Sequence, residues 1–326
     1  MSGQLFLRAG RAVRGIPGAG AAGPPVNRRR WLAAAALSFA VVGLSRAATT
    51  VVDGHASYPE CPLWHEGRLF FVEYAADDIK VWDGRSLAIY WKKEHCGPSG
   101  LAEFGAGHLL VACYDSNSLV ELDGRGVELR SISADDRGRA FTGPNDFASD
   151  GAGGLYFSAS GEYDIRAPIT GTVLHLSKEG VATELAGTIH YSNGLALSHD
   201  GKHLLVAEML AGRILEFPIL ADGSLGPRRV WARLSDLAPP TSGTDAYNGP
   251  DGVRAGADGN YYIAQNGSGR VLVVDEQRKL VRQIRLPTRY VTNVGFGPDG
   301  PGTLYITGLF DAWHAPYAGV VYRWTR

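Results

Sequence analysis

Apolar runs separated by short polar turns fill the chain from about residue 50 to its last residues. In six copies a short polar residue opens such a run, and a second apolar run begins nine to eleven positions later. The opening residues are Glu60, Ser99, Asn145, Asn193, Asp251 and Asn293. A third run begins near Ile79, Leu119, Val173, Ile214, Val271 and Val320. The opening residues are 39 to 58 positions apart, and a repeat of this length with several strands per copy is typical of a β-propeller.

The turns between the runs support the same architecture. Asp-Gly dipeptides recur where the repeat requires hairpins, and they begin at Asp83, Asp123, Asp150, Asp200, Asp222, Asp258 and Asp299. No long segment after Ala48 follows the helical period, so we expect no sizeable helix there. The sequence therefore predicts an all-β domain over residues 48–326, a six-bladed β-propeller with four strands in each blade.

The last apolar run, which begins at Val320, is only the third strand of the sixth blade. The apolar, β-branched segment 49–53 is predicted to supply the fourth strand and to close the ring, since closure removes exposed sheet edges. Equivalent positions of a propeller converge on one axis, so the opening residues are expected at one mouth of the central channel. The long insertions 161–170 and 238–250 are expected to overhang this mouth and to shape a pocket.

Residues 1–47 differ in composition from the repeat. They contain seven arginines and no acidic residue, followed by the apolar stretch 32–44. The stretch is short for a membrane span but suits an export signal, and residues 28–32 (Arg-Arg-Arg-Trp-Leu) match the twin-arginine pattern. Ser45-Arg46-Ala47 offers a cleavage site. We predict a periplasmic or secreted protein that meets the membrane only during export; a retained anchor or a misplaced start codon is the alternative.

Charge argues against nucleic acid as a partner. The whole chain has 32 basic and 33 acidic residues, and without the seven arginines of the leader 25 basic residues remain, a formal net charge of −8. Phosphate backbones require basic neutralisation, which such a surface does not provide.

The three cysteines are too few for a disulfide scaffold. Cys96 and Cys113 are expected on the same rim of the second blade, where they can pair in an oxidising compartment and leave Cys61 free. Buried unpaired thiols are the alternative, and the sequence favours that alternative slightly.

Four of the opening residues form a chemically coherent set. Glu60, Asn145, Asn193 and Asp251 would bring two carboxylates and two amides together, and oxygen donors of this kind suit a hard divalent cation such as Ca²⁺, Mg²⁺ or Mn²⁺. Without a cation the two carboxylates would repel each other. Asn-Gly and Asp-Gly are also ordinary turn formers, but here they open inner strands in the same phase.

The motifs around these positions resemble the senescence-marker-protein/gluconolactonase family, also called regucalcin-like, over residues 55–325. They are Glu60-Cys-Pro-Leu-Trp64, Pro144-Asn-Asp146, Ser192-Asn-Gly-Leu-Ala-Leu-Ser198, Pro250-Asp-Gly-Val253 and Thr292-Asn-Val-Gly-Phe-Gly297. The resemblance implies a six-bladed propeller hydrolase with one divalent metal ion, Ca²⁺, Mg²⁺, Mn²⁺ or Zn²⁺. It implies that Glu60, Asn193 and Asp251 bind the metal, that Asn145 lies close enough to contact substrate or a metal-bound water, and that Asp251 is also the candidate general base.

One departure from the family concerns Gly143, which stands where mammalian-type members carry an arginine that grips sugar hydroxyls. Ser99 is a further candidate for substrate binding. His190 and Tyr191 lie just before Asn193, and Trp313 and His314 lie in the loop of the sixth blade. These four either line the pocket or pack within the rim, and His190 is the one we place among the substrate-binding residues.

Together these features predict a metal-dependent lactonase, a carboxylic ester hydrolase that opens a small-molecule lactone, most plausibly of a sugar acid, through metal-activated water. The chain contains no Gly-x-Ser-x-Gly elbow that would supply a serine nucleophile. A hydrolase of other esters or organophosphates is the alternative within enzymes. A non-catalytic propeller that binds a ligand is the alternative outside them, although it would need no pair of metal carboxylates.

Overall fold

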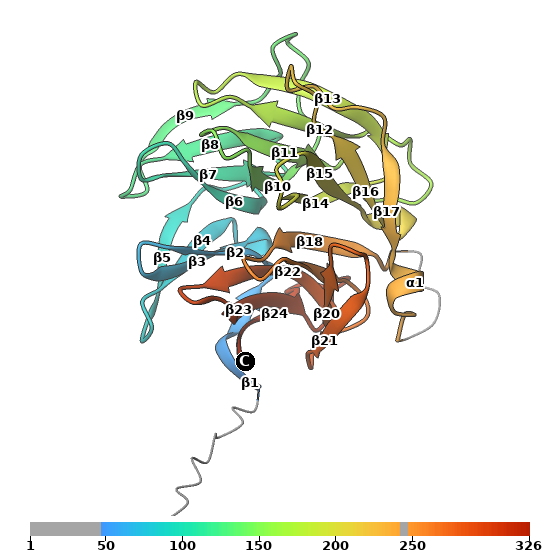
Figure 1. Cartoon of the computed structure of the whole chain (residues 1–326). Coiled ribbons are helices and arrows are strands. Elements are labelled where there is room, and N and C mark those ends of the chain that lie inside the picture. The colour runs from blue at the N-terminus through green and yellow to red at the C-terminus, as the bar shows by residue number, and fades with distance from the viewer. Residues whose placement is uncertain (1–46, 242–246) are drawn as a thin grey trace, which may run out of the picture. The chain divides into compact units, whose positions relative to one another are not determined.

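The computed structural model describes residues 47–241 and 247–326, which form six sheets of four antiparallel strands each. The sheets are arranged as the blades of a β-propeller (Figure 1). Six four-stranded blades are what the repeat predicts, so the fold prediction is confirmed. The predicted export signal lies outside the described residues, apart from Ala47.

Each of the first five blades uses four consecutive strands, numbered from the innermost outward. The first is β2 (Pro59–His65), β3 (Arg68–Glu73), β4 (Asp78–Trp82) and β5 (Leu87–Lys92), and the second is β6 (Pro98–Phe104), β7 (His108–Cys113), β8 (Ser118–Leu122) and β9 (Glu128–Ile132). The third is β10 (Pro144–Ser149), β11 (Leu155–Ala159), β12 (Gly171–Leu176) and β13 (Ala182–Ile189). The fourth is β14 (Ser192–Leu197), β15 (His203–Glu208), β16 (Arg213–Pro218) and β17 (Arg229–Arg233), and the fifth is β18 (Pro250–Ala255), β19 (Asn260–Gln265), β20 (Arg270–Asp275) and β21 (Leu280–Arg285).

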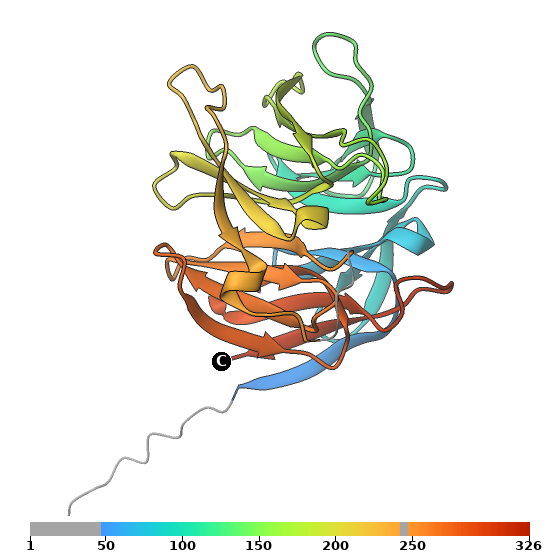
Figure 2. The ribbon, with the colours of Figure 1, turned by 90° about the vertical axis from the view of Figure 1, so that its right-hand side faces the viewer.

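The sixth blade joins both ends of the described chain. It consists of β22 (Tyr290–Gly297), β23 (Gly300–Leu309), β24 (Ala318–Thr325) and, outermost, β1 (Ala48–Ser57). β1 pairs antiparallel with β24, with Thr49 opposite Trp324, and it runs along the C-terminal blade in Figure 2. The predicted ring closure is confirmed, and the closing strand is longer than the segment 49–53.

Helical structure is minor in the part of the chain that the structure describes. It comprises α1 (Leu234–Leu237) and two 3₁₀ turns, η1 (Tyr74–Ala76) and η2 (Met209–Ala211). The expectation of no sizeable helix after Ala48 is therefore confirmed for these residues. None of their helices has the length and apolar character needed to span a bilayer.

The hydrophobic core lies between neighbouring blades. The alternating side chains of each strand face two ways, so the residues of one face pack against the preceding blade and those of the other against the next. One cluster joins Val72 and Ile79 of the first blade to Val111 and Val120 of the second, and all four are fully buried. This packing positions the inner strands around the axis.

Cys96 and Cys113 form a disulfide, so the slight preference for unpaired thiols was wrong. The reason is the local register. Pro98 at the start of β6 pairs with Cys113 at the end of β7, and Cys96, two residues before Pro98, lies next to Cys113. Their Cα atoms are 4.6 Å apart, within the range that a disulfide requires. Cys61 is free and buried.

Candidate active site

Five of the opening residues occupy the same position in their blades. Glu60, Ser99, Asn145, Asn193 and Asp251 are each the second residue of an inner strand. In all five blades the pairing with the next strand is irregular around this position, as in a β-bulge. A bulge bends its strand and re-aims a side chain, which is why bulges are frequent beside active sites. The same local irregularity thus directs all five side chains toward the axis.

The residues on either side of the opening position explain why it lies at the start of an inner strand. Proline directly precedes it in four blades, where the first residue of a strand tolerates proline. The glycine that follows Asn193 is not a turn residue, because its φ is not positive. A Cβ on Gly194 would lie 2.3 Å from the backbone nitrogen of Val253 in the neighbouring inner strand. The glycine allows the two strands to approach, so the turn-former alternative does not apply here.

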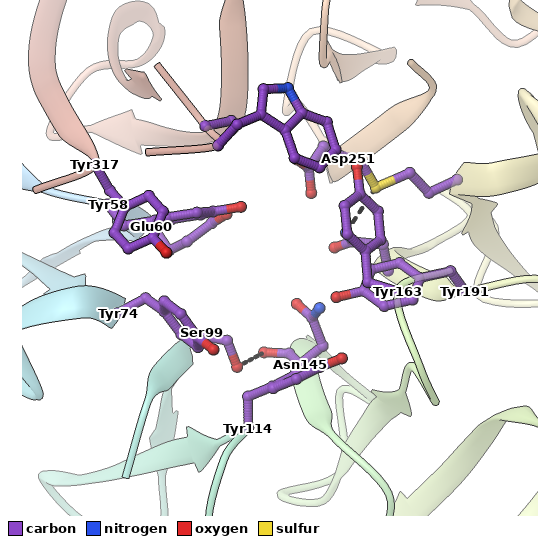
Figure 3. Close-up of a pocket in the computed structure, with 14 residues that line it drawn as sticks. Tyr58, Glu60, Tyr74, Ser99, Tyr114, Asn145, Tyr163, Tyr191, Asp251 and Tyr317 are labelled. Atoms are coloured by element: carbon purple, nitrogen blue, oxygen red, sulfur yellow. Dashed lines mark hydrogen bonds between the residues drawn. The ribbon is translucent and has the colours of Figure 1, made fainter. Parts of the chain in front are cut away.

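A cavity of about 220 Å³ lies at this mouth of the channel, and all five opening residues line it (Figure 3). The rest of its wall is mainly aromatic: the lining residues beside the five are Tyr58, Tyr74, Tyr114, Tyr163, Tyr191, Met209, Ala312, Trp313 and Tyr317. None of the described residues in this wall is lysine, arginine or histidine. The cavity therefore has a polar, acidic floor and an apolar rim.

The rim is made of seven aromatic side chains, which we call the aromatic belt. Its members are Tyr58, Tyr74, Tyr114, Tyr163, Tyr191, Trp313 and Tyr317. They come from the loops that lead into inner strands and from the loops that follow second strands. The insertion 161–170 contributes Tyr163, whose hydroxyl donates to the carbonyl of Tyr247 in the insertion 238–250 at 3.3 Å. The two insertions meet at this rim, as their lengths predict, although residues 242–246 lie outside the described part.

Two carboxylates share the floor, and burial raises the pKa of both. The pKa of Asp251 rises to about 8, because burial disfavours its charge and Asp146 adds repulsion. Burial likewise raises the pKa of Glu60 well above its ordinary value, with the charges of Asp251 and Asp146 adding to the effect. With no basic side chain in the described wall, no positive charge there offsets the cost of charging these two groups, and a bound cation would stabilise their charged forms.

The amides complete the donor set. The Nδ2 atom of Asn145 donates to Ser160 Oγ at 2.9 Å, and the Nδ2 atom of Asn193 lies 3.5 Å from Met209 Sδ. In each case the nitrogen is engaged by the protein, so the amide oxygen is the atom offered to a cation. Nowhere between residues 47 and 241 or from 247 onward do three or more His, Cys, Asp or Glu side chains form a metal-binding group. The candidate set accordingly fits a hard cation only if amide oxygens serve beside the two carboxylates.

Beneath the floor, an ion pair occupies the channel. Asp146 is fully buried and accepts from Arg254 Nη1 at 2.7 Å and from Nη2 at 2.9 Å. Nη2 also lies 3.4 Å from Cys61 Sγ. Asn293, the sixth opening residue, has its Nδ2 3.5 Å from Asp146 Oδ2 and does not line the cavity. Five of the six opening residues therefore meet at the mouth, and the sixth supports them from below.

Of the residues that the sequence places near substrate, Asn145 and Ser99 line the cavity and His190 does not. The hydroxyl of Ser99 donates to the carbonyl of Pro144 at 2.9 Å, so it also holds neighbouring inner strands together. Tyr191 and Trp313 line the wall, whereas His314 does not. The sequence analysis did not identify Tyr58, Tyr74 and Tyr114 as lining residues. The signal that could have identified them is their position next to the first or second strand of a blade.

Gly143, the departure from the family pattern, has a specific environment. Its φ is 62°, a conformation that side chains rarely adopt, and a Cβ there would lie 2.6 Å from Cε2 of Tyr114. Tyr114 of the aromatic belt thus fills the space next to this position.

Comparison with known proteins identifies the family and related folds. Residues 58–309 match the model of the SMP-30/gluconolactonase/LRE-like region. A 6-deoxy-6-sulfogluconolactonase from Pseudomonas putida is 30% identical over 252 residues, which cover 76% of this chain and 82% of the relative. Among solved structures, a gluconolactonase from Xanthomonas campestris superposes with a TM-score of 0.70 at 22% identity, covering 86% of this chain and 90% of the other. A calcium-binding regucalcin from Agrobacterium tumefaciens gives a TM-score of 0.67 at 20% identity, with coverages of 85% and 92%. At these identities the two structures show the shared fold.

Proposed function

The chain belongs to the SMP-30/gluconolactonase/LRE-like family, and we propose that it is a hydrolase that opens a lactone in the cavity lined by the opening residues. The observation that carries this proposal is the convergence of Glu60, Asn145, Asn193 and Asp251, from four separate blades, on one small cavity. The lactonase name of the Pseudomonas putida relative, which is 30% identical, supports the reaction class.

We further propose that one divalent cation binds at Glu60, Asn145, Asn193 and Asp251. Burial raises the proton affinity of both carboxylates, the charge of Asp251 adds to the effect on Glu60, and the described wall has no basic residue, so a cation would stabilise the charged forms. When bound, the cation supplies Lewis acidity toward the lactone carbonyl and toward water. Ca²⁺, Mg²⁺, Mn²⁺ and Zn²⁺ are the candidates.

The protein's own groups would prepare the substrate and water for attack. Asn266 Nδ2 donates to Asp251 Oδ2 at 2.9 Å and fixes the orientation of this carboxylate. Asp251 is therefore the residue we assign to orienting the attacking water and accepting its proton. Asn145 and Ser99, on the facing side of the floor, are assigned to contact with the lactone (Figure 3). The aromatic belt would exclude bulk water from the mouth.

The test is proton release from a panel of lactones in weakly buffered solution, with protein from Ala48 onward. The panel is run with EDTA and again after addition of each candidate cation. We expect acid release that EDTA abolishes and one cation restores. Hydrolysis that EDTA leaves unchanged would contradict the proposed cation. Absence of hydrolysis with every cation would contradict the proposed lactonase activity.

We also propose that residues 1–47 direct export through the twin-arginine route. The support is the Arg28-Arg29-Arg30-Trp31-Leu32 pattern with the apolar stretch and cleavage site after it. Cell fractionation of the full chain should find the protein in the periplasm or medium. The double variant Arg28→Lys, Arg29→Lys should stay in the cytoplasm; equal export of both chains would contradict this route.

A further inference from the structure

The aromatic belt forms a chain of ring contacts around the cavity mouth. Ring centroids are 5.9 Å apart for Tyr317 and Tyr58, and 5.2 Å for Tyr58 and Tyr74. The distance from Tyr74 to Tyr114 is 6.2 Å. All three lie in the range of favourable aromatic contacts. One half of the mouth is thus walled by rings that touch edge to face or at a tilt.

The other half continues the same contacts. Tyr114 lies 6.4 Å from Tyr191, and Tyr191 lies 4.7 Å from Tyr163. Tyr163 then stacks with Trp313 at 6.3 Å, with an angle of 18° between the ring planes. Trp313 belongs to the same loop as Tyr317, where the first half begins, so the chain of ring contacts returns to its starting loop.

Three members of the belt have a strained backbone conformation, which the surrounding structure must hold in place. Tyr58, Tyr191 and Tyr317 have φ values of 53°, 63° and 54°. Bulky residues rarely adopt this left-handed region, and residues held there cluster at ligand-binding and active sites. Ordinary packing of a rim does not require strained residues. The three strained tyrosines therefore indicate that this rim has a role in ligand binding.

Hydrogen bonds within the protein engage the polar atoms of several belt members, among them Tyr74, Tyr114 and Trp313. The hydroxyl of Tyr74 donates to Asp115 Oδ1 at 2.8 Å, and that of Tyr114 donates to the Gly161 carbonyl at 2.8 Å. The indole Nε1 of Trp313 donates to the hydroxyl of Tyr290 at 3.3 Å. The polar atoms of these three side chains already have partners in the protein, so their rings offer a ligand mainly apolar contact.

Charge sets a second condition on the ligand. The floor carries Glu60 and Asp251, and the described wall has no lysine, arginine or histidine. A carboxylate, sulfonate or phosphate on the distal part of a substrate would be desolvated at the belt without a cationic partner, which is costly.

From the belt and the charge distribution, we propose that this site selects uncharged lactones that carry a flat apolar group, an aryl-substituted lactone above all. The inference rests on the proposed lactonase function. The lactone ring lies at the floor, by Glu60 and Asp251, and the aryl group lies against the aromatic belt. The belt is thereby a specificity determinant for the part of the substrate that does not react.

Three γ-butyrolactones that differ only in the γ-substituent test this selection: phenyl, methyl and 4-carboxyphenyl. We expect kcat/KM for the phenyl lactone to exceed that for the methyl lactone by about tenfold or more. The 4-carboxyphenyl lactone should fall below the phenyl lactone by at least a similar factor. Equal rates for the three lactones, or a preference for the anion, would overturn the proposal.

Variants of the belt locate the effect. Trp313→Ala should lower the phenyl-to-methyl ratio of kcat/KM by about threefold to tenfold, and Trp313→Phe should retain most of the ratio, because it keeps a ring. Trp313 is 46% exposed on a loop, so neither change threatens the fold. Phe310→Ala, an exposed apolar residue on the same loop outside the cavity wall, is the matched control and should leave the ratio unchanged. A ratio that Trp313→Ala leaves intact would contradict the assignment.

Binding of the corresponding lactams separates this inference from the lactonase proposal. The lactams with γ-phenyl and γ-methyl groups have the same shape but resist hydrolysis, and calorimetry measures their affinities directly. Tighter binding of the phenyl lactam that Trp313→Ala weakens supports the belt, even if no lactone is cleaved. Equal affinities of the two lactams would contradict the proposed role of the belt and would not affect the lactonase proposal.

Discussion

Asp251 owes its candidate role to neighbours that only the fold brings to it. Asn266 orients its carboxylate, and burial together with the charge of Asp146 raises its pKa to about 8. An isolated aspartate in water would have a pKa near 4. The position at the start of β18 thus turns a common residue into one that holds a proton near neutral pH.

Replacing this carboxylate tests its role most directly. Asp251→Asn keeps the size of the side chain but removes its charge and its capacity to accept a proton. We expect kcat/KM for the best lactone to fall by about 10²- to 10⁴-fold, while circular dichroism shows an intact fold. Asp236→Asn, on the exposed surface of α1, is the control and should behave as wild type. Turnover close to wild type in Asp251→Asn would remove this residue from the mechanism.

A second residue-scale prediction concerns the close approach of inner strands. In Gly194→Ala the new Cβ would meet the backbone nitrogen of Val253 at 2.3 Å, so the strands must move apart. Overpacking of this kind costs about 1–3 kcal/mol of unfolding free energy, which denaturant titration measures. The control Gly187→Ala finds its nearest neighbour at 3.7 Å and should change stability by less than about 1 kcal/mol. Equal effects of the two substitutions would refute the close-approach explanation.

The candidate site was predictable from sequence where the repeat carried the information. Glu60, Asn145, Asn193 and Asp251 were found because each opens an inner strand in the same phase. Tyr58 and Tyr163 were not found, since loops have no period and the direction of a loop side chain depends on its tertiary contacts. His190 was chosen for its nearness to Asn193 in the sequence, but it lies in the turn before β14 and is not among the residues that line the cavity.

At the scale of elements, the disulfide links two segments that each lead to the cavity wall. Cys96 lies three residues before Ser99, and Cys113 directly precedes Tyr114. The bond joins the loop before β6 to the end of β7. It therefore holds part of the floor and part of the aromatic belt in one unit.

Loss of this bond should be measurable in two ways. The double variant Cys96→Ser, Cys113→Ser releases a loop closed by a separation of 17 residues, and we expect a stability loss of about 3 kcal/mol. We also expect a higher KM, since Ser99 and Tyr114 lose their shared restraint. Reductant should reproduce the shift in melting temperature in wild type and have no effect on the variant. A wild type insensitive to reductant after unfolding and refolding would argue against the bond in solution.

For the whole molecule, the acidic floor predicts how stability depends on pH in the absence of a cation. A carboxyl group whose pKa is raised by folding binds its proton more tightly in the folded than in the unfolded chain. For Asp251 the stabilisation is complete below about pH 4 and is lost as pH rises toward about 8. Glu60 acts in the same direction.

The melting temperature in EDTA should therefore fall as pH rises from 5 to 8. A bound cation stabilises the charged carboxylates, so the added metal that restores activity should raise the melting temperature most at the upper end of this range. Scanning fluorimetry across this pH series, with EDTA and with each cation, measures both effects. Asp251→Asn should show a weaker fall with pH. A melting temperature that rises with pH in EDTA would contradict the charge assignment of the floor.

The global fold was more predictable than the site. Six copies of an apolar pattern, regular Asp-Gly turns and a missing final strand were enough to predict six blades and their closure by the N-terminal segment. The disulfide could not be predicted in the same way, because pairing depends on a Cα separation that register and loop path set together. Long-range packing therefore determines features, such as the disulfide, that local sequence patterns do not specify.

The pairing of β1 with β24 also has a consequence for the order of events during synthesis. The hydroxyl of Thr50 donates to the carbonyl of Arg323, a contact between positions 273 residues apart. On the ribosome the first strand of the propeller must wait until β24 has been translated before its partner exists. Closing so long a loop is slow relative to forming a single blade. The five blades that use consecutive strands can form one after another as they emerge, whereas the sixth can be completed only after β24 has emerged as well.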